Sequence, residues 1–147
     1  MKTVVSHSLE ETQKLAREWL ASLSAPTSES GATIVGLYGN LGAGKTAFTQ
    51  AVARELGIEE PTTSPTFVIE KLYETKHSFF KRLVHIDAYR LDAGRELTAL
   101  DFEILVENPN NLILIEWPEN VKEILPESHL KIRCEFVDET TRKFEFE

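Results

Sequence analysis

The sequence of 147 residues lacks several features that are typical of disulfide-bonded, zinc-binding, membrane or secreted proteins. It contains one cysteine, Cys134, which excludes an internal disulfide and a zinc site built from several cysteines. No apolar run approaches the roughly 20 residues that a membrane span needs, and the N-terminal stretch lacks the apolar core of a signal peptide. We therefore expect a cytoplasmic protein that is not associated with a membrane.

Positive charge is scarce as well. The chain has 16 Lys and Arg against 24 Asp and Glu, so its formal net charge is −8. Proteins that grip nucleic acid usually gather basic residues in a patch or stripe, whereas here they are scattered among more numerous acids. Direct, tight binding of RNA or DNA is therefore disfavoured. The length predicts a single domain, residues 1–147, large enough to form a core without disulfides.

Periodicity and breaking residues predict an alternation of helices and strands. A capping box at Ser8–Glu11 begins an amphipathic helix over about 8–23. Short apolar runs predict strands, two of which are joined by a hairpin turn at 75–78. The predicted strands are 32–38, 67–74, 79–91, 112–115, 129–137 and 141–146, and the further helices are 45–56, 93–106 and 119–125.

One segment between a predicted strand and a predicted helix, "GNLGAGKT", matches the phosphate-binding P-loop, G-x-x-x-x-G-K-[ST]. Its glycines allow backbone N–H groups to converge on phosphate oxygens, and the following helix directs its positive dipole end at the anion. Lys45 is predicted to bridge the β- and γ-phosphates and Thr46 to ligate Mg²⁺. The predicted nucleotide-binding residues here are Gly39, Asn40, Leu41, Gly42, Ala43, Gly44, Lys45, Thr46 and Ala47.

The loop and the order of elements predict an α/β fold of the three-layer, P-loop NTPase type. We expect a mostly parallel central sheet with an antiparallel hairpin and antiparallel strands late in the chain. The guanine-binding motif N-K-x-D is absent from the sequence, and "NPNN" does not match it. ATP is therefore favoured over GTP.

Two acids are candidates for the metal and the attacking water, which a P-loop enzyme holds with an acid at the end of a neighbouring strand. Asp87 ends "RLVHID" and Glu116 ends "LILIE", so both occupy predicted strand C-termini, where ligands collect in open α/β sheets. We expect Glu116 to be the closer Mg²⁺ group, although aspartate is the usual residue. Asp87 is then the catalytic or water-positioning acid, and the sequence leaves open which of the two lies nearest the metal.

Other polar residues near these motifs carry weaker predictions. Ser64 and Thr66, in the proline-stiffened stretch "PTTSPTF", resemble a switch segment that senses the γ-phosphate. Arg90 is a candidate arginine finger and equally a surface residue. His85 lies inside a strand pattern, where a histidine is more often a core or paired residue than a ligand.

Four segments, "LYGNLGAGKT", "SPTF", "HIDAYRL" and "IEWPEN", with the "SLEET" helix before them, together resemble the TsaE (YjeE) family. The resemblance covers nearly the whole chain. It implies a cytoplasmic bacterial ATPase of tRNA threonylcarbamoyladenosine biosynthesis that uses ATP and Mg²⁺ and is feeble alone. It also implies a TsaB–TsaD heterodimer as partner, which modifies adenosine 37 of tRNAs reading ANN codons, so that tRNA is contacted only through partners.

The resemblance further implies roles for single residues. Thr46 and Glu116, with Asp87 near them, would be the Mg²⁺ groups, and Trp117 would lie by the site or the partner surface. Asn40 stands where an aspartate is often found, with little expected effect because that position offers mainly backbone. The segments implied to lie near the adenine are Glu11–Thr12 and Thr141–Arg142.

Two other functions remain open at this point. A small-molecule kinase shares the P-loop, but it needs an acceptor pocket and usually an arginine-rich lid, which the sequence does not display. A nucleotide-dependent binding switch with negligible chemistry would require ATP binding alone.

Overall fold

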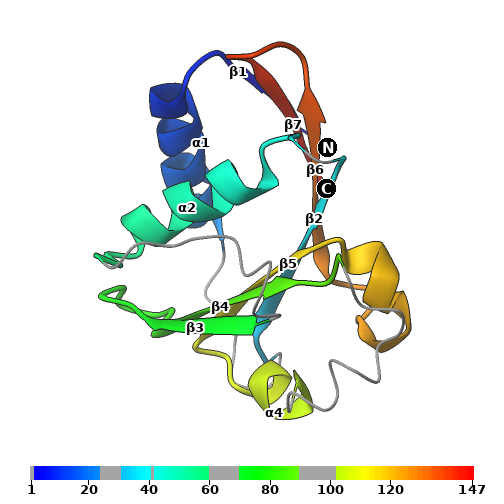
Figure 1. The fold of residues 1–147 in the computed structure, drawn as a ribbon. Coiled ribbons are helices and arrows are strands. Elements are labelled where there is room, and N and C mark those ends of the chain that lie inside the picture. Colours follow the sequence, from blue (N-terminus) through cyan, green and yellow to red (C-terminus); the bar gives the residue numbers. More distant parts are fainter. Residues whose placement is uncertain (1, 24–30, 41, 60–69, 90–101) are drawn as a thin grey trace.

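The computed structural model describes residues 2–23, 31–40, 42–59, 70–89 and 102–147 (Figure 1). These residues form a seven-stranded sheet of order β1-β7-β6-β2-β5-β4-β3, flanked by helices. The strands are β1 (Lys2–Ser6), β2 (Thr33–Tyr38), β3 (Glu70–Glu74), β4 (Arg82–Asp87), β5 (Asn111–Glu116), β6 (Leu130–Phe136) and β7 (Arg142–Phe146). The helices are α1 (Leu9–Ser22), α2 (Lys45–Glu55), α4 (Phe102–Glu107) and the 3₁₀ helix η1 (Pro118–Ile124).

The centre of the sheet is parallel and both of its edges are antiparallel. β2 lies between β6 and β5, and β4 follows β5, all in parallel pairings. The β3–β4 hairpin closes one edge, and β7 with β1 outside it closes the other, all antiparallel. This arrangement confirms the predicted α/β sheet with a hairpin and late antiparallel strands. Burial on both faces explains the apolar run of β5, whose six residues are all buried.

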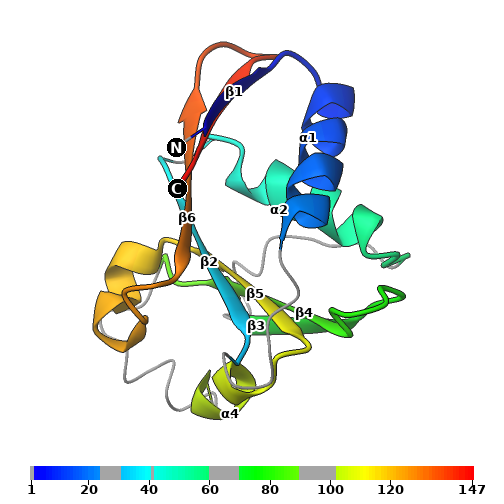
Figure 2. The same cartoon turned by 180° about the vertical axis from the view of Figure 1, so that it is seen from behind.

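Helices cover both faces of this sheet (Figures 1 and 2). Because successive side chains of a strand point to opposite faces, one apolar strand supplies two cores. The core beneath α1 and α2 takes Leu37, Leu83, Leu112 and Leu114 from the sheet. The core beneath α4 and η1 takes Ile34, Val84, Ile113 and Ile115.

The two longest described helices begin where the sequence predicts. The Ser8 hydroxyl accepts a hydrogen bond from the Glu11 N–H at 3.1 Å, which caps α1. The Glu11 carboxylate in turn accepts from the His7 N–H at 3.2 Å. α2 begins at Lys45, within the last two residues of the P-loop motif. None of the described helices is long and apolar enough to cross a membrane.

β1 is a described strand that the sequence analysis did not predict. Three of its five residues are exposed and only Ser6 is buried, so it has no alternating apolar pattern to detect. The strand predicted at 79–91 begins later, at Arg82, because Phe79 and Phe80 belong to the hairpin turn. The predicted loop 61–67 and parts of the strand 67–74 and the helix 93–106 lie outside the described residues.

The turn of the β3–β4 hairpin is built around a histidine. His77 Nδ1 accepts hydrogen bonds from the backbone N–H groups of Phe79 and Phe80, both at 3.0 Å. Burial lowers the pKa of His77 below its ordinary 6.5, and the nearby Lys81 ammonium lowers the pKa further. A proton on Nδ1 would remove the acceptor of both hydrogen bonds, so the hairpin favours the neutral ring.

Acid should therefore weaken this hairpin. The unfolded chain binds the His77 proton more tightly, so the stabilisation is complete above the ordinary pKa of about 6.5 and is lost as pH falls through the lower folded-state pKa. His77→Asn keeps a side-chain acceptor for the same N–H groups but does not titrate. In denaturant titrations from about pH 7.5 to about pH 5, we expect the free energy of unfolding to fall more steeply for wild type. Equal pH dependence in both proteins would contradict this prediction.

Candidate functional site

The P-loop joins β2 to α2 at the carboxyl edge of the parallel strands. Gly39 begins the loop with φ +146°, and a side chain there would overlap the carbonyl oxygen of Cys134 on β6. Within the loop the Ala43 N–H donates to the Asn40 carbonyl at 3.1 Å, forming a tight turn. The loop is therefore pressed directly against the sheet, with its last residues leading into the N-terminus of α2.

Lys45, the first residue of α2, is folded back over the loop. Its ammonium Nζ donates to the Gly39 carbonyl oxygen at 2.5 Å and lies 3.5 Å from the centroid of the Trp117 ring. The residue is 4% exposed. Burial lowers the pKa of Lys45, while the charges of Glu116 and Glu119 oppose that shift. The site thus holds a desolvated cation beside the loop amides.

A buried carboxylate lies next to this cation. The Thr46 hydroxyl donates to Glu116 Oε1 at 3.2 Å, and the His85 Nε2 lies 2.6 Å from Glu116 Oε2. Glu116 is 3% and His85 1% exposed. The three residues come from α2, β5 and β4, so the carboxylate is the point at which these elements meet. A hydroxyl and a carboxylate at this spacing are oxygen donors of the kind that Mg²⁺ prefers, and the site fits the ion.

Asp87 lies beside Glu116 because the parallel strands β4 and β5 pair these two residues in register. The turn that follows Asp87 is fixed by three hydrogen bonds. Asp87 Oδ1 accepts from the Tyr89 N–H, the Ala88 N–H donates to the Glu116 carbonyl, and the Asn120 amide donates to the Ala88 carbonyl, each at 2.9 Å. These bonds hold Asp87 and the turn after it next to the segment that follows β5.

Trp117 turns the chain sharply at the end of β5. It has φ +59° and ψ +49°, and among the described residues it is the only one other than glycine with positive φ. This left-handed conformation starts η1 at Pro118 and lays the indole over Lys45, with the Tyr89 ring 5.0 Å from it. Such backbone strain is characteristic of functional sites.

A pocket of about 430 Å³ opens beside the P-loop, between the start of α1 and the β6–β7 turn. Its volume is within the range of small-ligand pockets. The Arg142 side chain runs along Gly44, within 3.2 Å of where a side chain there would begin. The lining residues are His7, Ser8, Leu9, Glu10, Thr12, Gly44, Ala47, Glu139, Thr140, Arg142 and Phe144.

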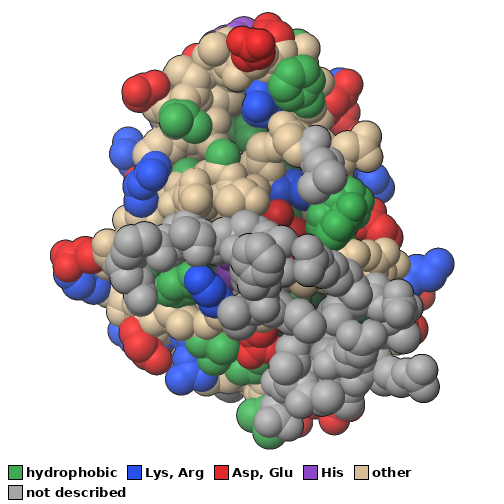
Figure 3. Space-filling model, in the orientation of Figure 1, with side chains coloured by type: hydrophobic (Ala, Val, Ile, Leu, Met, Phe, Trp, Pro, Cys, Tyr) green, Lys and Arg blue, Asp and Glu red, His purple; other side chains and the backbone are tan. Residues whose placement is uncertain are grey.

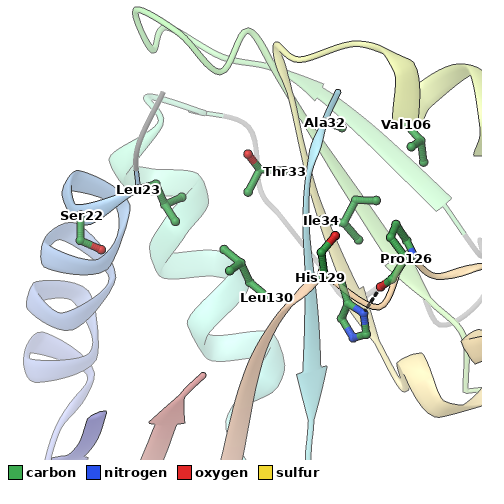
Figure 4. Close-up of a pocket in the computed structure, with 10 residues that line it drawn as sticks. Ser22, Leu23, Ala32, Thr33, Ile34, Val106, Pro126, His129 and Leu130 are labelled. Carbon is green, nitrogen blue, oxygen red and sulfur yellow. Dashed lines mark hydrogen bonds between the residues drawn. The ribbon is translucent and has the colours of Figure 1, made fainter. Parts of the chain in front are cut away.

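A larger hollow of about 540 Å³ lies at the opposite end of β2, at its N-terminal residues (Figure 4). Its histidine, His129, is already engaged, because Nδ1 lies 2.7 Å from the Pro126 carbonyl oxygen and Nε2 lies 2.8 Å from the Tyr38 hydroxyl. Ligands of open α/β sheets bind at the carboxyl ends of the strands. Size alone therefore does not mark the site here.

The structure brings most of the predicted site residues to one edge of the sheet. Thr12 and Arg142 line the pocket beside the loop, whereas Glu11 does not and serves as part of the α1 cap. His85 is a paired histidine, as its position in the strand predicted, but its partner was not foreseen. Grouped around the loop are Gly39, Asn40, Gly42, Ala43, Gly44, Lys45, Thr46, Ala47, Asp87, Glu116 and Trp117. Leu41, Ser64, Thr66 and Arg90 lie outside the described residues.

Sequence reasoning missed several contributors to the site. Asn120, whose side-chain amide holds the turn after Asp87, is the last residue of the segment "IEWPEN", but no local pattern marks its hydrogen bond to the Ala88 carbonyl. The pocket residues His7, Glu10, Glu139 and Thr140 follow no local pattern. They meet only because β1 and β7 are neighbours.

Comparisons with known proteins agree with this geometry. The family model described as "Threonylcarbamoyl adenosine biosynthesis protein TsaE" matches residues 6–144. The tRNA threonylcarbamoyladenosine biosynthesis protein TsaE of Aquifex aeolicus is 34% identical over 143 residues, covering 90% of this chain and 95% of that protein. The protein of the same name from Mycobacterium tuberculosis is 36% identical over 110 residues, 71% of this chain but only 64% of that longer protein. The crystal structure of Bacillus subtilis YdiB superposes with a TM-score of 0.75 and 26% identity, covering 99% of this chain and 83% of that one.

The contact between the P-loop and β6 yields a stability prediction. Gly42 also has positive φ, +79°, but a side chain there would meet nothing within 4 Å among the described residues. Gly42→Ala should therefore cost only the left-handed strain, about 1–2 kcal/mol. Gly39→Ala should cost more, because its methyl group must also displace the Cys134 carbonyl, an overpacking of about 1–3 kcal/mol. Denaturant unfolding of both variants measures the difference, and an equal loss in the two would refute the proposed packing.

Proposed function

The chain belongs to the TsaE family, and from this membership we propose that it is a Mg²⁺-dependent ATPase that serves tRNA threonylcarbamoylation. The observation that carries the proposal is the meeting of the P-loop, Lys45, Thr46 and two strand-end acids at one edge of the sheet. That edge is where nucleotides bind in folds of this kind. The reaction is hydrolysis of ATP by in-line attack of water on the γ-phosphate.

Catalysis in this scheme is mostly positioning and electrostatic stabilisation. The loop amides and the N-terminus of α2 receive the phosphates, and Lys45 stabilises the charge that develops on the β- and γ-oxygens. Lys45 is already buried, so its interaction with phosphate is little screened by water. Trp117 closes the site over this ammonium.

Thr46 and Glu116 would hold Mg²⁺, with Asp87 close by. When bound, the ion would supply positive charge that offsets the negative charge of the phosphates. Asp87 orients the attacking water and accepts its proton. Its carboxylate is held by the Tyr89 N–H, and the turn that follows is held by the Asn120 amide. The sequence left the order of the two acids open. The hydrogen bond from the Thr46 hydroxyl to the Glu116 carboxylate places Glu116 beside the other proposed metal-binding residue, which supports Glu116 as the acid nearer the metal.

The pocket of about 430 Å³ beside Gly44 is the proposed place of the adenosine. It continues from the P-loop toward Thr12 on α1 and Arg142 on β7, which the resemblance had implied near the adenine. Arg142 is steadied by donating to the carbonyls of Asp138 and Thr141. Its guanidinium plane therefore offers a fixed surface at the pocket.

The partner in this proposal is a TsaB–TsaD-type heterodimer, which would transfer the threonylcarbamoyl group to adenosine 37 of tRNAs reading ANN codons in the cytoplasm. Contact with tRNA would then pass through that partner. The charge of −8 supports this indirect role. On the face drawn in Figure 3, acidic and basic side chains of the described residues are interspersed, without a broad basic patch among them.

Two substitutions test the chemistry. Lys45→Ala should lower ATP turnover at least about 100-fold, as expected for removal of a transition-state donor, while Lys14→Ala on the exposed face of α1 should leave turnover unchanged. Asp87→Ala should bind ATP yet fail to hydrolyse it. Unchanged turnover in Lys45→Ala would refute the P-loop assignment. An Asp87→Ala protein that binds ATP without turnover and still supports tRNA modification would favour a binding switch.

The partner is tested by measuring ATP hydrolysis of the chain alone and with a TsaB–TsaD pair, with tRNA modification followed in parallel. We expect at least about tenfold stimulation, the size of a single missing stabilising contact of about 1.4 kcal/mol, together with modification. Turnover that is indifferent to the partner, without modification, would leave a generic phosphohydrolase or kinase, and phosphorylated small-molecule products would then be sought.

A further inference from the structure

One buried polar ring near the site has no part in the scheme above. His85 lies in the middle of β4 and is 1% exposed. It shares a sheet face with Leu83 and Leu114, which belong to the core beneath α1 and α2. A polar group in such surroundings is costly unless it is hydrogen-bonded. The hydrogen bond to Glu116 therefore offsets the cost of burying a histidine at this position.

The chemistry of the acceptor assigns the donor in this bond. An ionised carboxylate can only accept hydrogen bonds, so at 2.6 Å the His85 Nε2 must be the donor. The other ring nitrogen, Nδ1, takes no part in this bond. That atom is buried and has no hydrogen-bond partner among the described residues. Among the described residues, the ring is therefore hydrogen-bonded only to Glu116, through Nε2.

The Glu116 carboxylate is held from two elements. On β4 the His85 Nε2 lies 2.6 Å from Oε2, and on α2 the Thr46 hydroxyl lies 3.2 Å from Oε1 and 3.5 Å from Oε2. With Oε2 bound to the imidazole, Oε1 is directed toward Thr46. Glu116 Oε1 and the Thr46 hydroxyl oxygen then lie together, where both can bind a cation. Without the imidazole, the Thr46 hydroxyl would be left to orient the carboxylate, and its distances of 3.2 Å to Oε1 and 3.5 Å to Oε2 distinguish the two oxygens only weakly.

We propose that His85 is a positioning residue that orients the Glu116 carboxylate for Mg²⁺ and makes no contact with the nucleotide. This inference rests on the proposed function, because it assigns Mg²⁺ to Thr46 and Glu116. Partners of this kind fix the orientation and basicity of metal-binding groups, and their loss commonly weakens metal affinity 10- to 100-fold. A ring that served only to fill the core would not affect the metal in this way.

The test compares two amides at position 85. In His85→Gln the amide nitrogen lies as many bonds from Cβ as Nε2 does, so it reaches Glu116 Oε2. In His85→Asn the amide nitrogen is one bond shorter and matches Nδ1, so it cannot reach. Both variants place a neutral amide in the core, which makes them a matched pair for burial of a polar group.

Binding of ATP is measured by calorimetry with Mg²⁺ and with a chelator, and Mn²⁺ coordination in the nucleotide complex is followed by electron paramagnetic resonance. We expect His85→Asn to raise the Mg²⁺ concentration at half-saturation about 10- to 100-fold, while His85→Gln stays within about threefold of wild type. The affinity for ATP measured in the presence of the chelator should be the same in wild type and in both variants. The Mn²⁺ spectrum should broaden in His85→Asn alone.

Three results would overturn the inference. The first is wild-type Mg²⁺ dependence in His85→Asn. The second is an equal loss of metal-free ATP binding in both variants, which would indicate a packing role. The third needs no variant: long-range ¹⁵N–¹H spectra of the wild-type histidines should show His85 protonated on Nε2, and protonation on Nδ1 alone would exclude the donor role. If wild type itself gains no ATP affinity from Mg²⁺, the proposed function fails first and this inference falls with it.

Discussion

A carboxylate removed from water must find hydrogen-bond donors inside the protein, and the site is arranged around one such group, Glu116. Its donors come from the first turn of α2 and from the middle of β4, so the helix, the two strands and the P-loop cannot shift independently. The register between β4 and β5 then fixes Asp87 one strand away. The apolar residues of β5, buried on both faces, provide the rigid support that such a buried charge needs.

The lysine of the loop illustrates a second consequence of burial. In water an ammonium must lose part of its hydration before it can bind phosphate closely. Lys45 has lost that hydration during folding, and the lowered pKa records the cost. The Gly39 carbonyl and the Trp117 ring carry no full negative charge, and the nearby carboxylates, Glu116 foremost, offset the desolvation only in part. A phosphate is therefore a better partner for this cation than the groups that now surround it.

Much of this arrangement could be predicted from the sequence, because its determinants are local. The P-loop has a fixed spacing, and runs such as "LILIE" mark buried parallel strands that end in an acid. Asp87 and Glu116 meet because consecutive parallel strands end at the same edge, a general property of the fold. The left-handed Trp117 and the hydrogen bond of the Asn120 amide could not be predicted, since no pattern marks a residue whose conformation depends on packing. The same holds for β1, whose exposed edge carries no alternation.

The pairing of β1 with β7 joins residues 2–6 to residues 142–146. Consequently β1 has no partner in the sheet until β7, far along the chain, has been synthesised. The pocket between α1 and the β6–β7 turn shares this dependence, since its two walls come from opposite ends of the chain. Loop closure over such a sequence separation is slow compared with local hairpin formation. The nascent chain can therefore complete its parallel centre only after β6 has been synthesised, and it acquires the adjoining pocket only after β7 has followed.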